Sequence, residues 1–129
     1  MNEPIFLTLD EVLIIHARSL AEHGGSGGIR DRGLVESALA SAKNIFYYAS
    51  GDWFDVAAGY AFHIAESQAF IDGNKRTAVV AAMVFLARNG VYAQPSRWEL
   101  YTAMIDVAKK TKTKADLADI FRKCAQIEN

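Results

Sequence analysis

Residues 78–87 constrain the fold of this chain more than any other segment, because all ten of them are apolar. At helical spacing such a run is hydrophobic around almost its whole circumference, which is typical of a helix buried at the centre of a protein core. Ten residues are about half the length of a membrane-spanning helix, so the run predicts a core element. We expect this helix to cover about residues 74–89 and to stop at Gly90.

Capping signals and apolar spacing predict further helices around this central one. Thr8 and Glu11, like Ser96 and Glu99, have the spacing of a capping box, which is typical of a helix start. The additional helices are expected at about residues 9–22, 31–43, 54–68, 96–109 and from 113 onward. No two segments form a convincing pair of strands. The predicted fold is therefore all-α, a compact bundle of about six helices around a central buried helix.

Length and charge limit the number of domains and the kinds of partner. With 129 residues, 51% of them hydrophobic, the chain can form one core and is too short for two ordinary domains, so we expect a single domain over residues 1–129. The 14 Lys and Arg residues nearly balance the 15 Asp and Glu residues, which argues against nucleic acid or an anionic membrane as partner. The basic run at residues 109–114 is interpreted as a solvated linker.

Cysteine content and the amino terminus indicate the compartment. The single cysteine, Cys124, cannot form an internal disulfide and has no metal-ligand pattern near it. The first residues lack the basic region of a secretory signal peptide. We therefore expect a soluble protein of the reducing cytoplasm.

The sequence Asp-Gly-Asn-Lys-Arg stands at the start of the central helix. Gly73 and Asn74 would lie at the helix N-terminus, where free backbone amides and the helix dipole attract anions. Arg76 can hold phosphate with its planar guanidinium group and Lys75 with a point charge. Asp72 could hold a magnesium ion between phosphate oxygens. An ordinary capped turn with solvated basic residues can have the same sequence, so these residues alone leave both interpretations open.

With its neighbours, this segment resembles the signature of a known family. Phe70 lies two residues before Asp72, and Arg76 lies two residues after Asn74, as in the Fic/Doc signature His-x-Phe-x-Asp/Glu-Gly/Ala-Asn-x-Arg. The likeness is to the Doc, or death-on-curing, branch, which typically continues Asn-Lys-Arg-Thr. Fic enzymes that transfer nucleotides instead read Asn-Gly-Arg and carry a second arginine three positions later, where this chain has Val79.

The resemblance spans about residues 8–92 and implies a toxin of a toxin–antitoxin pair. It implies a kinase that uses ATP and magnesium to transfer phosphate to a hydroxyl of a translation protein, elongation factor Tu in the family. The residues to which it gives roles are Asp72 for the metal, and Gly73, Asn74, Lys75 and Arg76 for phosphate binding and charge neutralisation. The antitoxin is expected to contain a disordered segment that folds as a helix on binding.

One departure from the family pattern lies at the base position. Where the family has the histidine that takes the proton from the acceptor hydroxyl, this chain has Gln68. Glutamine can orient a hydroxyl but cannot accept its proton near neutral pH, and loss of a general base costs about 10²- to 10⁴-fold in rate. His63 is not expected to replace it, because five residues along a helix place it roughly 140° around from Gln68. Glu66 is also off that face.

Three functions therefore remain open from the sequence. Phosphoryl transfer depends mostly on positioning and charge neutralisation, so a kinase can keep activity with Gln68. The alternative is a catalytically degenerate member that binds nucleotide or antitoxin and regulates by occupancy; a nucleotidyl transferase is a minor alternative.

Two further segments receive an interpretation from the sequence. We expect a binding groove near Tyr47, Tyr48 and Trp53. We interpret residues 24–28 as a flexible connector without a phosphate role.

Overall fold

Six helices and two short strands form residues 2–127, the part of the chain that this computed structural model describes. The helices are α1 (Leu9–His23), α2 (Arg32–Ala49), α3 (Trp53–Ser67), α4 (Asn74–Arg88), α5 (Arg97–Ala108) and α6 (Lys114–Lys123). The strands are β1 (Val91–Ala93) and β2 (Ala125–Ile127). The predicted all-α class with about six helices is confirmed.

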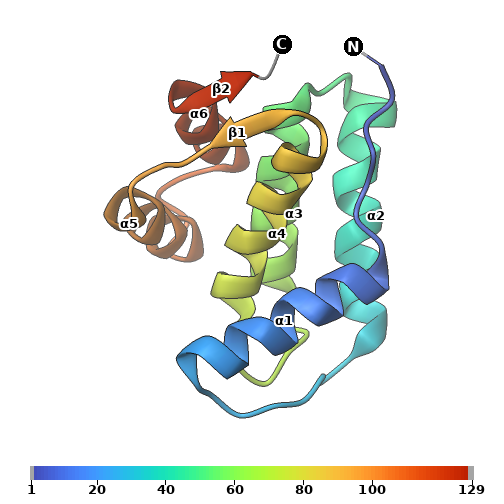
Figure 1. The fold of residues 1–129 in the computed structure, drawn as a ribbon, viewed down its shortest axis with the longest axis vertical. Coiled ribbons are helices and arrows are strands. Elements are labelled where there is room, and N and C mark those ends of the chain that lie inside the picture. Colours follow the sequence, from blue (N-terminus) through green and yellow to red (C-terminus); the bar gives the residue numbers. More distant parts are fainter. Residues whose placement is uncertain (1, 128–129) are drawn as a thin grey trace.

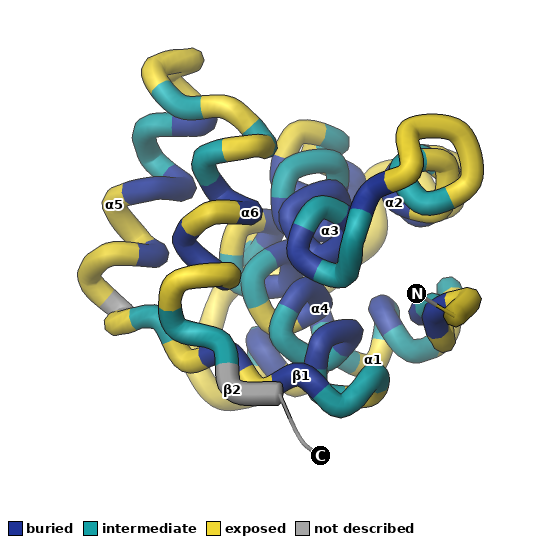
Figure 2. Tube along the Cα trace, turned by 90° about the horizontal axis from the view of Figure 1, so that it is seen from above, coloured by how far each residue is buried: buried dark blue, intermediate teal, exposed yellow. Residues whose placement is uncertain are grey.

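Helix α3 runs antiparallel to both α2 and α4, and α1 lies across one end of these three helices (Figure 1). Helix α3 packs against α2, α4 and α6, so it shares the central position with α4. Figure 2 shows the buried positions gathered on α3 and on the inner side of α4. Helix α4 is not covered all round, since Val80 remains 37% exposed and Met83 and Val84 are only half-buried.

Polar side chains begin the helices where the sequence predicted them. Thr8 and Glu11 form the reciprocal capping box of α1, and the Ser96 side chain accepts the Glu99 backbone N–H at the start of α5. Helix α2 continues to Ala49, six residues beyond its predicted end. Its last turns are stabilised by tertiary packing, because Ile45 and Phe46 contact the core although β-branched and aromatic residues have modest helix propensity.

The prediction that no strands pair is wrong for one short ladder. Strand β1 pairs antiparallel with β2, with Val91 opposite Ile127 and Ala93 opposite Ala125. Strands of three residues are too short to show an alternating pattern, and these two lie far apart in the sequence. Among residues 2–127, no helix has both the length and the hydropathy that crossing a membrane requires.

Candidate functional site

The turn between α3 and α4 brings the predicted motif to the end of the molecule where α1 crosses the other helices (Figure 1). Gly73 is the N-cap of α4 and has a left-handed backbone, with φ of 81°. A Cβ atom there would lie 3.6 Å from His16 Cδ2, and the left-handed conformation would strain any other residue. Gly73 and Asn74 thus stand at the start of α4, as the sequence predicted, and no side chain of the described residues caps this helix, which leaves its first backbone amides without a capping partner.

The glycine-rich residues 24–31 form a second wall of this turn. The Arg30 backbone N–H donates to the Ala69 carbonyl at 2.6 Å, and Ser26 N–H donates to Asp72 Oδ2 at 2.8 Å. The interpretation of this stretch as a flexible connector is therefore wrong: its backbone is hydrogen-bonded to the motif. Sequence reasoning missed the pairing because loop backbone contacts leave no periodic pattern in the residue types.

Asp72 is exposed, and the backbone of the glycine-rich segment holds its carboxylate. A Cβ atom added to Gly25 would lie 3.3 Å from Asp72 Cβ, and Gly25 has φ of 121°, so both space and backbone conformation favour glycine. Among residues 2–127, no group of three or more His, Cys, Asp or Glu side chains could hold a metal ion. A cation at Asp72 would therefore need further oxygen ligands from a bound phosphate or from water.

The Asn74 side chain closes the turn. This residue is only 8% exposed; its Oδ1 accepts the Phe70 N–H at 3.1 Å and its Nδ2 donates to the Phe70 carbonyl at 2.9 Å. Gln68, the C-cap of α3, points its amide to the same place: Nε2 donates to the Ala65 carbonyl at 2.9 Å, and Oε1 lies 3.5 Å from Asn74 Nδ2. Asn74 therefore has a structural role besides the phosphate role predicted for it.

The two cations of the motif differ in their surroundings. Arg76 is half-buried and donates from Nη2 to the Gly24 carbonyl at 3.3 Å, which links α4 to the end of α1. Lys75 is exposed and forms no hydrogen bond or ion pair within the described part of the chain. Val79, at the position of the second arginine in nucleotidyl-transferring enzymes, packs against the core. Two positive charges thus lie within the first turn of α4.

His16 packs against the motif turn, and no role was assigned to it from the sequence. It is 5% exposed, and its ring stacks on Phe70 with centroids 3.8 Å apart. His16 Nε2 lies 2.8 Å from the Asp72 carbonyl oxygen, and since a carbonyl only accepts, Nε2 carries the proton. The available signal was a histidine on the apolar face of the first helix, one turn after the buried Val12.

His63 and Glu66 face away from the turn, as the sequence predicted. His63 Nε2 lies 3.1 Å from Lys114 Nζ at the start of α6. Burial, and then the Lys114 charge, lower the pKa of His63. Glu66 lines a groove formed with the α5–α6 connection. Within the part of the chain that the structure describes, neither residue forms a hydrogen bond or ion pair with Gln68 or Asp72, so neither replaces the missing base.

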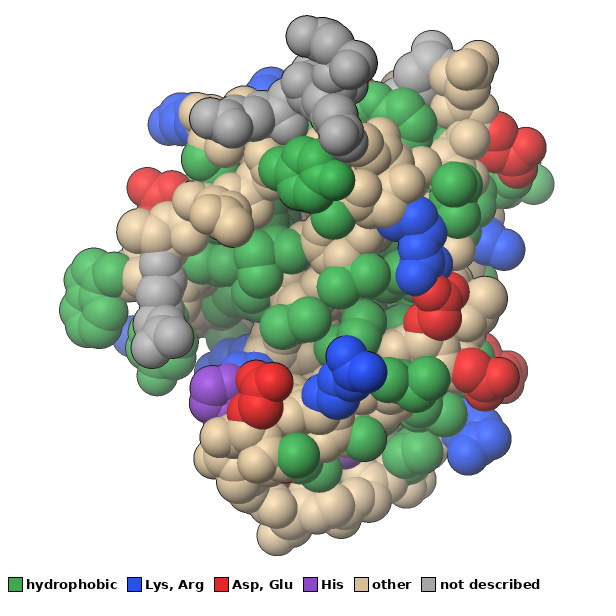
Figure 3. Space-filling model, in the orientation of Figure 1, with side chains coloured by type: hydrophobic (Ala, Val, Ile, Leu, Met, Phe, Trp, Pro, Cys, Tyr) green, Lys and Arg blue, Asp and Glu red, His purple; other side chains and the backbone are tan. Residues whose placement is uncertain are grey.

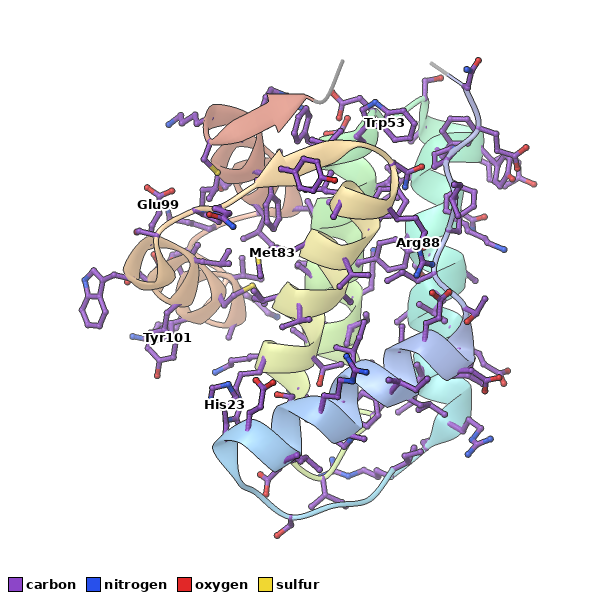
Figure 4. The ribbon with its side chains drawn as sticks, in the orientation of Figure 1. His23, Trp53, Met83, Arg88, Glu99 and Tyr101 are labelled. Atoms are coloured by element: carbon purple, nitrogen blue, oxygen red, sulfur yellow. The ribbon has the colours of Figure 1, made fainter. Side chains whose placement is uncertain are left out.

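The aromatic residues expected beside the site lie at the opposite end of the helices. Trp53 begins α3 and Gln68 ends it, so a helix of 15 residues, about 22 Å long, separates them (Figure 4). Tyr48 is 85% exposed, whereas Trp53 is half-buried against the core and Tyr47 bonds to the Glu3 carboxylate. Tyr48 and Trp53 therefore do not lie beside the motif turn as expected, because the whole length of helix α3 separates them from it.

Comparison with known proteins is consistent with this geometry. The model of the Fic/DOC family matches residues 6–86, which is more than half of the chain. The chain belongs to the Fic/DOC family. The matched region holds α1, the glycine-rich wall, the motif turn and nearly all of α4, and it ends before α5 and α6.

Two curated relatives of this Fic/DOC protein are similar over most of the site. It is 31% identical over 115 residues to "Protein kinase doc" of Escherichia phage P1, which covers 88% of this chain and 90% of that relative. It is 39% identical over 85 residues to "Toxin Doc" of Mycolicibacterium smegmatis, which covers 64% of this chain and 65% of that relative. Its relatives thus include a protein kinase and a toxin.

Proposed function

We propose that this Fic/DOC protein is the toxin of a toxin–antitoxin pair and acts in the cytoplasm. It transfers the γ-phosphate of ATP to a hydroxyl of a translation protein, an elongation factor Tu-like target. The observation that carries the proposal is the uncapped N-terminus of α4, which combines open amides with an adjacent carboxylate and two cations. The relative named as a protein kinase supports the reaction class.

Each residue of the turn has a role in this reaction. The Gly73 and Asn74 backbone amides hold phosphate oxygens, together with the one Asn74 Nδ2 hydrogen that does not bond to Phe70. The cations of Lys75 and Arg76 neutralise the charge that develops on the transferred group. Arg76 can do so because its bond to the Gly24 carbonyl is long and partly exposed. In-line transfer needs this positioning more than it needs covalent chemistry from the protein.

The donors around Asp72 fit a magnesium ion. A single carboxylate with phosphate oxygens and water is a common set of ligands for this hard cation. Among the described residues, the only hydrogen bond to the Asp72 carboxylate is the one that Oδ2 accepts from Ser26 N–H. When bound beside Asp72, magnesium would offset the negative charge of the phosphate oxygens. The backbone of residues 24–28 would keep the carboxylate beside the start of α4.

Gln68 occupies the base position and acts as an orienting group. Its Oε1 can accept a hydrogen bond from the acceptor hydroxyl, and the weak 3.5 Å contact with Asn74 leaves that atom available. The hydroxyl proton then passes to an oxygen of the transferred phosphate or to water, and ADP leaves. In a loose transition state the bond to the attacking oxygen is only slightly formed, so the hydroxyl loses its proton late and needs a strong base less. The reaction is expected to be about 10²- to 10⁴-fold slower than with a histidine at this position.

The antitoxin is proposed to cover the open side of α4. Arg76, Val80, Met83 and Val84 share one face at helical spacing, and Figure 3 shows hydrophobic side chains gathered over α4 between α1 and α5. A segment that folds as an amphipathic helix could bury this face and reach Arg76 at its end. Inhibition would then follow from occupation of the phosphate site.

A regulatory binding module is the second candidate, and Gln68 favours it. The side chain that should accept a proton instead bonds to the Ala65 carbonyl and faces Asn74. Such a protein would keep its nucleotide or antitoxin site and act by occupancy. A nucleotidyl transferase is a minor candidate, because Val79 replaces the second arginine.

The test uses the purified chain, magnesium, bacterial translation factors and ATP labelled at either the α- or the γ-phosphate. We expect transfer of the γ label by the unaltered chain, at least about tenfold less with Lys75→Ala, and stronger transfer with Gln68→His. Lys75 is the preferred variant because it is exposed, whereas Asn74→Ala would also release Phe70. Lys109→Ala, an exposed lysine at the end of α5, is the matched control.

The other outcomes distinguish the candidates. Transfer of the α label would show a nucleotidyl transferase. Label that appears only with Gln68→His would show an intact nucleotide site without a base. No label from either chain would refute the kinase and support the binding module.

A further inference from the structure

A groove of about 330 Å³ lies between the C-terminal half of α3 and the α5–α6 connection. The residues that line it, which we call the lysine groove, include Phe62, Glu66, Val107, Lys110, Lys112 and Lys114. None of these residues belongs to the motif turn, and His63, which bonds to Lys114, faces away from that turn. The proposed phosphate transfer does not use this groove.

The backbone that carries Lys110 and Lys112 forms a hydrogen-bonded turn. The Asp106 carbonyl accepts the Thr111 N–H at 2.8 Å, the Thr111 hydroxyl at 3.1 Å and the Lys112 N–H at 3.3 Å. Lys110 has a left-handed backbone, with φ of 63°, which completes the reversal. A surface that is ordered before binding loses less conformational entropy when a partner arrives.

Lys114 is fixed by two contacts with α3. Its ammonium nitrogen lies 3.1 Å from His63 Nε2 and 5.5 Å from the centroid of the Phe62 ring. An ammonium group only donates, so His63 accepts and is neutral in this arrangement. The wall beside Lys114 therefore adds no second positive charge, and the positive rim consists of the three lysines.

The chemistry of the groove favours a short acidic peptide segment over nucleic acid. Phe62 and Val107 give the groove an apolar floor that a phosphate backbone does not need, whereas an apolar side chain of a peptide would be buried there. The positive charge is confined to one short turn and faces Glu66, and a polyanion needs a longer basic stripe. Carboxylates beside an apolar anchor complement both features.

We propose that the lysine groove docks an acidic segment of a partner protein. One apolar side chain of the segment packs on Phe62 and Val107, and carboxylates on either side of it pair with Lys110, Lys112 and Lys114. The basic run at residues 109–114, which is interpreted from the sequence as a solvated linker, thus carries a recognition surface.

The experiment selects ligands from a random 12-residue peptide library displayed on phage, with the full chain as bait. We expect enriched peptides to combine two or more acidic residues with an apolar one, and to bind more weakly as salt rises. Lys110→Glu with Lys112→Glu should weaken binding at least about tenfold in fluorescence anisotropy. Lys109→Glu with Lys123→Glu makes the same change of net charge on exposed residues outside the groove and should leave binding within about twofold.

Glu66→Gln provides a test whose expected result, tighter binding, could not come from a misfolded protein. It removes the negative charge from the groove, so the selected acidic peptides should bind more tightly. The proposal is overturned if the enriched peptides show no acidic preference, if both double variants bind them equally, or if Glu66→Gln weakens binding. A uridine 12-mer that binds the chain and displaces the peptides through Lys110 and Lys112 would replace the proposal by RNA binding.

Discussion

At the residue scale, the motif turn depends on a side chain that the motif does not contain. His16 stacks on Phe70 and donates to the Asp72 carbonyl, and it lies next to the position where Gly73 has no Cβ. These contacts fix the backbone that directs the first amides of α4. His16 therefore positions the motif turn and, through it, the proposed phosphate site, because it contacts the loop and not the reacting groups.

Replacing His16 tests this role. His16→Leu keeps an apolar side chain but removes the donor, and should lower the free energy of unfolding by about 1 kcal/mol. Hydrogen exchange of the Ser26 and Ile71 backbone amides, which bond to Asp72 Oδ2 and to the Gly28 carbonyl, should accelerate about fivefold, since local opening of the turn loses the same bond. NMR-detected exchange measures this, and His16→Gln, whose amide can donate, should restore part of the protection. Exchange that changes only within α1 would contradict the role.

Tyr60 connects the amino-terminal segment to α3. Its buried hydroxyl accepts the Leu7 N–H at 3.1 Å, and burial raises the pKa of Tyr60 to about 12. Tyr60→Phe leaves the Leu7 N–H unpaired and should cost about 1–3 kcal/mol of stability in urea unfolding at pH 7. The folded pKa is raised, so this difference between the two proteins should shrink as pH rises above 10 through about 12. A difference that grows over that range would contradict the assignment.

At the element scale, α2 and α3 pack closely because α3 has a glycine at the contact. A Cβ atom on Gly59 would lie 2.4 Å from Ile45 Cδ1 and 3.4 Å from Ala42 Cα. Glycine inside a helix costs about 1 kcal/mol relative to alanine, so the close packing offsets an intrinsic penalty. Helix α3, which leads into the motif turn, is therefore held close to α2.

A double-mutant cycle tests this contact. Gly59→Ala should destabilise the protein by about 1–2 kcal/mol through overpacking, despite its better helix propensity. Ile45→Val removes Cδ1, the atom that the new Cβ would meet, and alone should cost about 1 kcal/mol. In the double variant the two effects should not add, and urea unfolding should show a favourable coupling of about 1 kcal/mol. Additive losses would mean that Ile45 does not limit the approach of the helices.

At the scale of the whole molecule, the ends of distant helices are tied together on the side away from the motif. Glu11, in the capping box of α1, pairs with Arg88 at the end of α4. The adjacent Asn89 bonds to both backbone groups of Ile5, at 2.8 and 3.1 Å. These contacts hold α1 in place across the end of the bundle, and through His16 they support the motif turn.

Acid should remove this connection over a defined range of pH. The hydrogen bond from Arg88 is the main cause that lowers the pKa of Glu11 from 4.5 to about 2. The folded pKa is depressed, so the stability contributed by the pair is complete above pH 4.5 and is lost as pH falls towards 2. Arg88→Met should cost about 1 kcal/mol at pH 7 and much less near pH 2, measured by urea unfolding. An equal cost at both pH values would assign the loss to packing of the arginine stem.

The sequence by itself determined the helical class, most helix starts and the residues of the motif. Side-chain caps such as Thr8 act within one helical turn, and apolar spacing is a local property of the chain. Both signals can therefore be recognised without knowledge of the fold. The family signature likewise lies within nine consecutive residues. The positions of Gln68, Asp72 and the first amides of α4 follow from these local features.

Only the tertiary structure decided which distant segments complete the site. It brought residues 24–31 and His16 to the motif, and it placed Tyr48 and Trp53 at the other end of α3. It also turned a basic linker into the rim of the lysine groove by setting Phe62 and Val107 beneath it. These outcomes depend on backbone hydrogen bonds and packing between segments far apart in the chain, which leave no periodic mark in the residue types.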